Sequence, residues 1–266
     1  MTSPSAAVTD LEESPDRSAA PAWRLLLVAV AIVCAVYFPI WLGRIVFGSD
    51  VAHWKFPARW FVRDSLLRGE WPAWNPFQGL GFPIFANPLY GIFYPPNWLF
   101  LLAPPDWVAS LLTWQDFAHL MWGGVGMFLV ARRLVGSPVA ACVAALAWSL
   151  AGYNTSQWTA GLLLVAGAWV PWAAVGHLAL LDSLRSGRRR WPMGVVKAAL
   201  PTAMGFLVGE VFVAMMGVGF ALATTAAAEV LERRHNPARA RLRASWLVVF
   251  ACAPALAAGL AAITLV

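Results

Sequence analysis

The chain has 266 residues, of which 60% are hydrophobic and only 12% are charged, and its mean hydropathy is +0.66. Soluble domains are about half apolar and about a quarter charged, so this composition excludes an ordinary soluble domain and predicts an all-α polytopic membrane protein. The formal net charge of +6 is expected of a membrane protein with basic cytoplasmic loops, and we do not expect nucleic acid as a partner.

The first 22 residues differ in composition from the rest of the chain. They are rich in Ser, Ala and Pro and include four acidic residues, and a segment of this kind has too few apolar side chains to form a core. We therefore expect residues 1–22 to form a disordered cytoplasmic tail and residues 23–266 to form the transmembrane domain.

A helix needs about 20 apolar residues to cross the hydrocarbon core of a bilayer. Seven segments are candidates: 24–47, 106–131, 137–153, 158–181, 192–208, 211–230 and 245–266. With the N-terminus in the cytoplasm, only five of the 19 Lys and Arg residues fall outside, namely Arg44, Lys55, Arg59, Arg63 and Arg68. The excess of positive charge on the inside supports this orientation. Because the last apolar segment runs to residue 266, we expect the chain to be truncated at its C-terminus.

One large extracytoplasmic loop, residues 48–105, follows the first span. Its first part has helical periodicity, with Lys55, Arg59 and Arg63 recurring every four residues and Pro57 marking an early turn or a kink. This pattern predicts an amphipathic helix in the membrane interface. Two interpretations of the basic stripe stay open: it anchors the loop to anionic lipid, or it binds the phosphate of a lipid-linked substrate.

The second part of the loop, residues 69–100, contains six prolines, three asparagines, ten aromatic residues and a single charged side chain, Glu70. Its prolines exclude one continuous helix, and its aromatic content is too high for a solvated linker. Irregular backbone at membrane depth is tolerated where protein buries it or where it lines a watery cavity. We expect this segment to form a lid or wall at the mouth of an intramembrane cavity.

The motif order in this loop resembles a known family. Trp74-Asn75-Pro76, Asn87-Pro88 and Tyr94-Pro95-Pro96-Asn97-Trp98 follow the basic helix at a characteristic spacing, and together they resemble the YfhO-like bacterial membrane proteins, a family similar to the GT-C glycosyltransferases. The resemblance covers roughly residues 24–230. It implies an enzyme of the bacterial cytoplasmic membrane that transfers a sugar from a polyprenyl phosphate to a cell-envelope acceptor on the extracytoplasmic face.

The resemblance also implies a catalytic carboxylate just after the first span, where this chain has Asp50. Asp50 would act as a general base or would hold a divalent cation, Mg or Mn. A hard cation prefers several oxygen ligands, and the flanking Ser49 and Val51 supply no second carboxylate, which weakens the metal alternative. The alternative without chemistry is that Asp50 is a helix N-cap.

The remaining candidates are assigned to substrate binding. Those in the loop are His53, Arg59, Arg63, Asn75, Asn87 and Tyr94. Asp116 and His119 lie inside the second span, where ionisable groups are costly and by default face a cavity or each other. They are three residues apart, so we weigh a role in the site equally against a local structural pair. Two rival functions stay open: a transporter or flippase of lipid-linked glycans, which would depend on Asp116 and His119, and a non-catalytic membrane scaffold.

Overall fold

The computed structural model describes residues 21–46, 48–159, 161–186, 191–235 and 244–262. The predicted tail therefore lies outside the described residues, apart from its last two. The chain is about 81% helical, and the one sheet in the described residues is a two-residue antiparallel pair of β1 (Trp74–Asn75) and β2 (Phe82–Pro83). The prediction of an all-α fold is confirmed.

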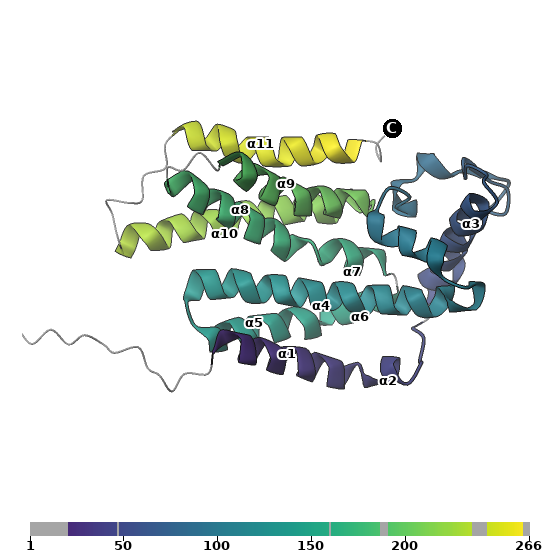
Figure 1. Ribbon diagram of the computed structural model, residues 1–266, viewed down its shortest axis with the longest axis horizontal. Helices are drawn as coiled ribbons and strands as arrows, with labels where there is room; N and C mark the ends of the chain where they lie inside the picture. The colour runs from purple at the N-terminus through teal and green to yellow at the C-terminus, as the bar shows by residue number, and fades with distance from the viewer. Residues whose placement is uncertain (1–20, 47, 160, 187–190, 236–243, 263–266) are drawn as a thin grey trace, which may run out of the picture.

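The helices form two groups that lie side by side (Figure 1). The first group contains α1 (Ala22–Val36), α4 (Val108–Val135), α5 (Pro138–Leu150) and the short α6 (Gly152–Ser156). The second contains α7 (Leu162–Gly167), α8 (Val170–Arg185), α9 (Trp191–Leu207), α10 (Val211–His235) and α11 (Ala244–Ala261). Contacts of α4 with α7, α8 and α10 join the groups.

Small residues allow α4 and α5 to pack closely. A Cβ atom added to Gly123 would lie 2.5 Å from the indole nitrogen of Trp148, and one added to Gly124 would lie 2.4 Å from the hydroxyl of Ser149. Both distances are too short for a Cβ atom unless the side chains of Trp148 and Ser149 shift. Gly123 and Gly124 therefore allow α4 and α5 to lie close together in the first group.

Each predicted span contains a helix, but the lengths vary. Two stretches in the described residues are long and apolar enough to cross a bilayer: Leu162–Arg185, which joins α7 and α8, and Val211–Arg234 in α10. The predicted first span is divided into α1 and α2 (Phe38–Trp41), because Pro39 cannot donate the hydrogen bond that would continue α1. At 15 residues, α1 is about 22 Å long, shorter than the hydrocarbon core.

The long helices alternate in direction, so their connections gather at two ends (Figure 1). The segment 48–105 lies at one end with the turns at 151–161 and 208–210. This segment contains η1 (Val51–Lys55), α3 (Phe56–Leu67), β1, β2, η2 (Ile84–Ala86), η3 (Pro88–Tyr90), η4 (Pro95–Leu102) and η5 (Pro105–Trp107), and the turn at 151–161 contains η6 (Gln157–Thr159). The opposite end carries the last turns of α4, α8 and α10.

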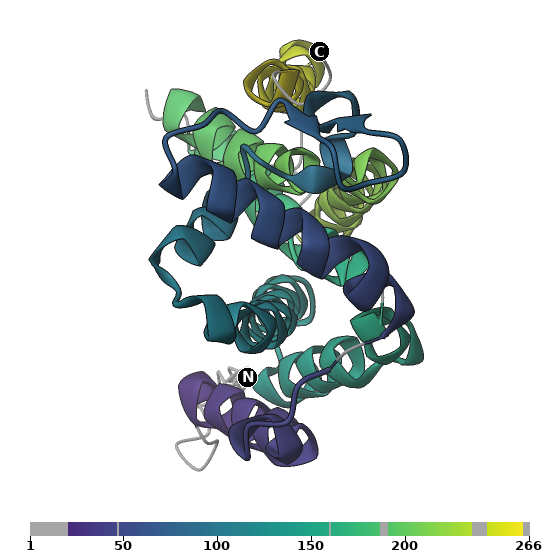
Figure 2. The same ribbon diagram turned by 90° about the vertical axis from the view of Figure 1, so that its right-hand side faces the viewer.

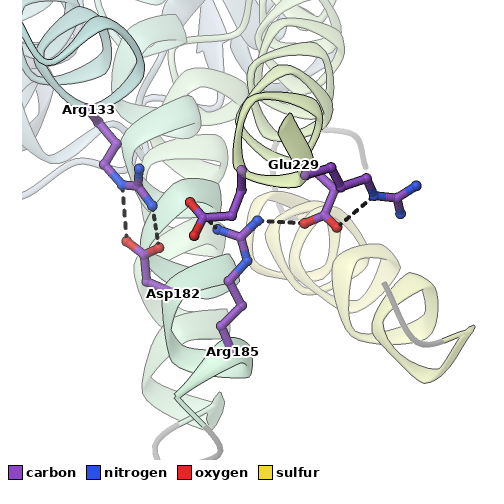
Figure 3. A network of polar contacts seen from close by, with 6 residues as sticks. Arg133, Asp182, Arg185 and Glu229 are labelled. Carbon is purple, nitrogen blue, oxygen red and sulfur yellow. Dashed lines mark hydrogen bonds and ion pairs between the residues drawn. The ribbon is translucent and has the colours of Figure 1, made fainter. Parts of the chain in front are cut away.

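Ion pairs join the helices at that opposite end (Figure 3). Arg133 of α4 donates to Asp182 of α8 at 2.7 Å, and Arg185 of α8 donates to Glu229 of α10 at 2.6 Å. Arg233 donates a further hydrogen bond to Glu229 at 3.3 Å. Glu229 is therefore the shared acceptor that ties α8 to the end of α10.

We expect Glu229→Gln to lower the free energy of unfolding by about 1–3 kcal/mol, because the buried carboxylate accepts from two arginines and its charge would be lost. The side chain of Glu229 is 4% exposed, whereas that of the neighbouring Glu232 is 32% exposed and lies 3.9 Å from Arg185. The matched Glu232→Gln variant should change stability by less than about 0.5 kcal/mol. Thermal unfolding of both variants in one detergent measures the difference, and equal losses would contradict a special role for Glu229.

Candidate functional site

The helix α3 lies across the end of the bundle, roughly perpendicular to the long helices (Figure 2). It is preceded by one turn of π-helix, η1, in which the backbone N–H of Phe56 donates to the carbonyl of Val51. Pro57 occupies the first turn of α3, where its missing N–H costs nothing. The predicted helix is therefore present, with Pro57 in the first turn of α3 and the wider π turn before it.

The basic face of this helix is buried. Lys55, Arg59 and Arg63 are 1%, 6% and 9% exposed. The interpretation of these side chains as a stripe facing anionic lipid is wrong, because Lys55 is buried against α4, and Arg59 and Arg63 are buried against the part of the loop between Tyr90 and Ala103. Arg59 donates to the carbonyl of Tyr90, and Arg63 donates through Nε to the carbonyl of Phe100 at 3.0 Å and through both Nε and Nη2 to that of Ala103.

A buried ion pair joins the loop to α4. The ammonium of Lys55 lies 2.6 Å from the carboxylate of Asp116, and both side chains are almost fully buried. Burial lowers the pKa of Lys55, and the charge of Asp116 opposes that shift. Burial likewise lowers the pKa of Arg59 to about 10, with the charge of Asp116 again opposing the shift. The carboxylate of Asp116 is thus paired with the ammonium of Lys55 and buried away from solvent. It is therefore not available as a general base in this conformation.

A second polar network lies beside this pair. His119 donates through Nδ1 to the carbonyl of Gln115 at 2.7 Å, which leaves Nε2 as the acceptor of the hydrogen bond from the hydroxyl of Tyr94 at 2.5 Å. The indole of Trp169 donates to the same hydroxyl at 2.8 Å. Burial raises the pKa of Tyr94, so the phenol keeps its proton. The predicted local pair of Asp116 with His119 does not form. Asp116 pairs with Lys55 and His119 with Tyr94, both from the loop.

The two predicted binding asparagines support the backbone of the loop. The side-chain oxygen of Asn75 accepts from the N–H of Phe77, and that of Asn87 accepts from the N–H of Leu89, each at 3.0 Å. Such contacts two residues ahead are typical of Asx turns. Asn87 is the N-cap of η3, whereas the buried Asn75 also contributes to the wall of a pocket.

The larger pocket of the loop, which we call the aromatic pocket, has a volume of about 630 Å³. Aromatic side chains dominate its wall: Trp54, Phe56, Trp60, Phe61 and Phe77. Polar groups of His53, Asp64, Arg68, Asn75 and Gln78 are placed among them. Pockets of this volume accommodate small ligands, and flat rings with interspersed hydrogen-bonding groups suit an amphipathic ring such as a sugar.

The predicted catalytic carboxylate, Asp50, lies immediately before the first residue of η1. Asp50 is exposed, and its side chain does not cap the helix, so the interpretation as a plain N-cap is wrong. His53 is also exposed, donates through Nδ1 to the carbonyl of Ser49 at 2.8 Å, and lines the aromatic pocket. Within the described ranges no group of three or more His, Cys, Asp or Glu side chains is placed to hold a metal ion. The surroundings of Asp50 therefore offer a cation a single carboxylate.

The sequence matches no known family model, and comparison with curated proteins and with solved structures identifies no significant relative. The family resemblance therefore stays a prediction, and the site rests on its own geometry.

Lys55 and Trp169 are the partners that sequence reasoning did not assign. A signal for Lys55 was present, because a carboxylate in an apolar helix requires a cation and Lys55 is one of the basic residues of the adjoining loop. No comparable signal existed for Trp169, which reaches Tyr94 across 75 positions in the sequence.

Proposed function

We propose that this protein is a membrane glycosyltransferase of the GT-C type, or the N-terminal part of one. It transfers a sugar from a polyprenyl phosphate to an acceptor of the cell envelope on the extracytoplasmic face of the bacterial cytoplasmic membrane. In this proposal the seven predicted segments all span the bilayer, with the N-terminus in the cytoplasm and the loop 48–105 outside.

The aromatic pocket is the observation that carries the proposal. It lies in the segment 48–105, at the end of the bundle away from the ion pairs of Arg133 and Arg185. Its aromatic and polar lining is suited to a sugar ring, and His53 on its wall is three residues after Asp50. Asp50 is exposed and can meet a substrate, whereas the buried Asp116 cannot.

Asp50 is the proposed general base, which takes the proton of the acceptor hydroxyl as its oxygen attacks the anomeric carbon and the C–O bond to the phosphate breaks. Asn75 and His53 contact the sugar from the wall of the pocket. The described residues offer a divalent cation one exposed carboxylate, so the cation alternative would need phosphate oxygens of the donor to complete its coordination.

We expect Asp50→Asn to reduce transfer from a labelled polyprenyl-phosphate sugar by about 100-fold or more, because a general base contributes a factor of that order. Turnover is measured in membranes that contain the wild-type or variant chain at matched expression. Asp106→Asn is the matched control, since Asp106 is an exposed carboxylate of the same loop that lies in η5. Equal turnover of the Asp50 variant and the wild-type chain would reject Asp50 as the base.

The buried contacts of α4 favour one alternative, a transporter or flippase of lipid-linked glycans. Asp116 and His119 connect α4 to the loop through Lys55 and Tyr94, so a change at either residue would be transmitted to the segment that covers the bundle. This alternative predicts that translocation of a labelled lipid-linked glycan into the outer leaflet is lost on Asp116→Asn or His119→Gln and is retained on Asp50→Asn.

A further inference from the structure

The helix η4 has an apolar side that is largely uncovered. Side chains three residues apart lie on one side of a 3-10 helix, so Leu99 and Leu102 share a side, and they are 56% and 82% exposed. Trp98 next to them and Trp107 of η5 are each more than half exposed. Residues 71–105 include no charged side chain. We call Trp98, Leu99, Leu102 and Trp107 the apolar rim, and large exposed side chains of this kind mark a surface that contacts a membrane or another protein.

The other side of η4 is fixed to the protein. Phe100 is 2% exposed and packs with Val108 and Leu112 at the start of α4. Arg63 of α3 donates to the carbonyls of Phe100 and Ala103 at the C-terminal end of η4. The position of η4 is therefore set by α3 and α4, and the apolar rim is presented on a supported element.

The length of α4 sets the level of η4 relative to the bilayer. In the proposed orientation Arg132 lies at the cytoplasmic boundary, where basic residues gather. At a rise of 1.5 Å per residue, Leu112 lies about 30 Å from Arg132 along the helix axis and Val108 lies about 36 Å from it. The hydrocarbon core is about 30 Å thick, so η4 packs on α4 where the core meets the outer headgroups. A tilt of α4 would place η4 deeper.

We propose that the apolar rim lies in the outer leaflet of the membrane, at the boundary between the headgroups and the acyl chains. The indole of Trp98 donates to the carbonyl of Ile92 at 2.8 Å, so this polar group is satisfied within the loop. Tryptophan is enriched at this boundary, and exposed leucine side chains gain free energy when they leave water. The interfacial position that the sequence predicts for α3 thus belongs to the neighbouring η4 and η5.

The lack of charge distinguishes this contact from electrostatic anchoring. Residues 71–105 offer no cation to an anionic headgroup, so the depth of the apolar rim should be the same with and without phosphatidylglycerol. The proposal rests on the orientation of α4 given under the proposed function, and it requires neither Asp50 nor sugar transfer.

Spin labels in phosphatidylcholine vesicles test the contact. Leu99→Cys and Leu102→Cys are made in the full chain with its three native cysteines replaced by alanine, and the accessibility of each label to oxygen and to the polar relaxant NiEDDA is measured. We expect oxygen to relax both labels more than NiEDDA does, at a depth of about 5–10 Å below the headgroup surface.

Two reference labels make the result decisive. Leu222→Cys reports the hydrocarbon core, because Leu222 is an exposed side chain in the apolar α10, and Glu70→Cys reports water, because Glu70 is an exposed charge of the same loop. Stronger relaxation of the rim labels by NiEDDA, with Leu222→Cys in lipid, would overturn this proposal and leave the orientation intact. Rim labels protected from both relaxants would show cover by a second copy or another protein and would also overturn it. A label at Leu222 in water would overturn the orientation and the proposal together.

Photo-crosslinking keeps the proposal falsifiable if the labelled variants do not fold. The wild-type chain is reconstituted with a phosphatidylcholine that carries a diazirine in its acyl chain, and the modified peptides are mapped after irradiation. We expect modification within residues 98–107 and none within residues 64–70, which carry the exposed charges of Asp64, Arg68 and Glu70. Modification confined to the long apolar helices would overturn the proposal.

Discussion

The variant Asp116→Asn is expected to lose about 3–5 kcal/mol of stability, the largest effect we expect from a single change of charge in this chain. Its carboxylate lies 2.6 Å from the ammonium of Lys55, and its charge also acts on the buried Arg59. An asparagine of the same shape would leave the ammonium buried without a counterion. Thermal unfolding in detergent measures the loss, and Asp106→Asn, at an exposed position, should leave the midpoint unchanged.

The pH dependence of this variant has a definite sign. Burial already lowers the pKa of Lys55 in the folded protein, and removal of Asp116 takes away the charge that opposes the shift. Between this lowered pKa and the unfolded value of about 10.4, the unfolded chain binds more protons than the folded chain, so the stability of the variant rises with pH. A stability that falls or stays constant over this range would contradict a buried, uncompensated Lys55.

A double variant separates the charge from the packing. Lys55→Met combined with Asp116→Leu replaces the ion pair by apolar side chains of similar volume, and such replacements are often neutral or stabilising. We expect the double variant to recover most of the stability that Asp116→Asn loses. If it is as unstable as the single variant, the ion pair is needed for more than mutual neutralisation.

Gly209→Ala is expected to destabilise the chain by about 3 kcal/mol or more. Gly209 lies in the turn between α9 and α10 with φ of +100°, and a Cβ atom there would lie 2.2 Å from the carbonyl oxygen of Pro88. Both the backbone conformation and the close approach of η3 require glycine. The clash is with backbone, so relief requires the aromatic segment to move off the bundle.

Gly69→Ala isolates the backbone contribution. Gly69 has φ of +75°, and an added Cβ would meet no atom within 4 Å, so this variant should lose only about 1–2 kcal/mol. Limited proteolysis within residues 69–105 reports whether the segment has left the bundle, and we expect faster cleavage in Gly209→Ala alone. Equal stability and equal cleavage of the two variants would show that the contact with Pro88 is not needed for docking.

The sequence by itself determined the fold class and the position of every long helix, because apolar composition and periodicity are local properties of the chain. It also located the irregular, proline-rich loop and identified Asp116 and His119 as polar residues that need partners. The Asx contacts of Asn75 and Asn87 with the N–H groups two residues ahead are likewise local, since each joins neighbours within one short stretch of the loop.

Only the tertiary structure decided which partners those polar residues have and which face of α3 is buried. Helical periodicity separates a basic face from an apolar face, but it does not say which face lies against protein. The basic face of α3 is buried because the loop between Tyr90 and Ala103 supplies backbone carbonyls and α4 supplies a carboxylate, 31 to 61 positions away in the sequence. Long-range pairs of this kind depend on how the loop closes over the bundle, and no local pattern of residues encodes that closure.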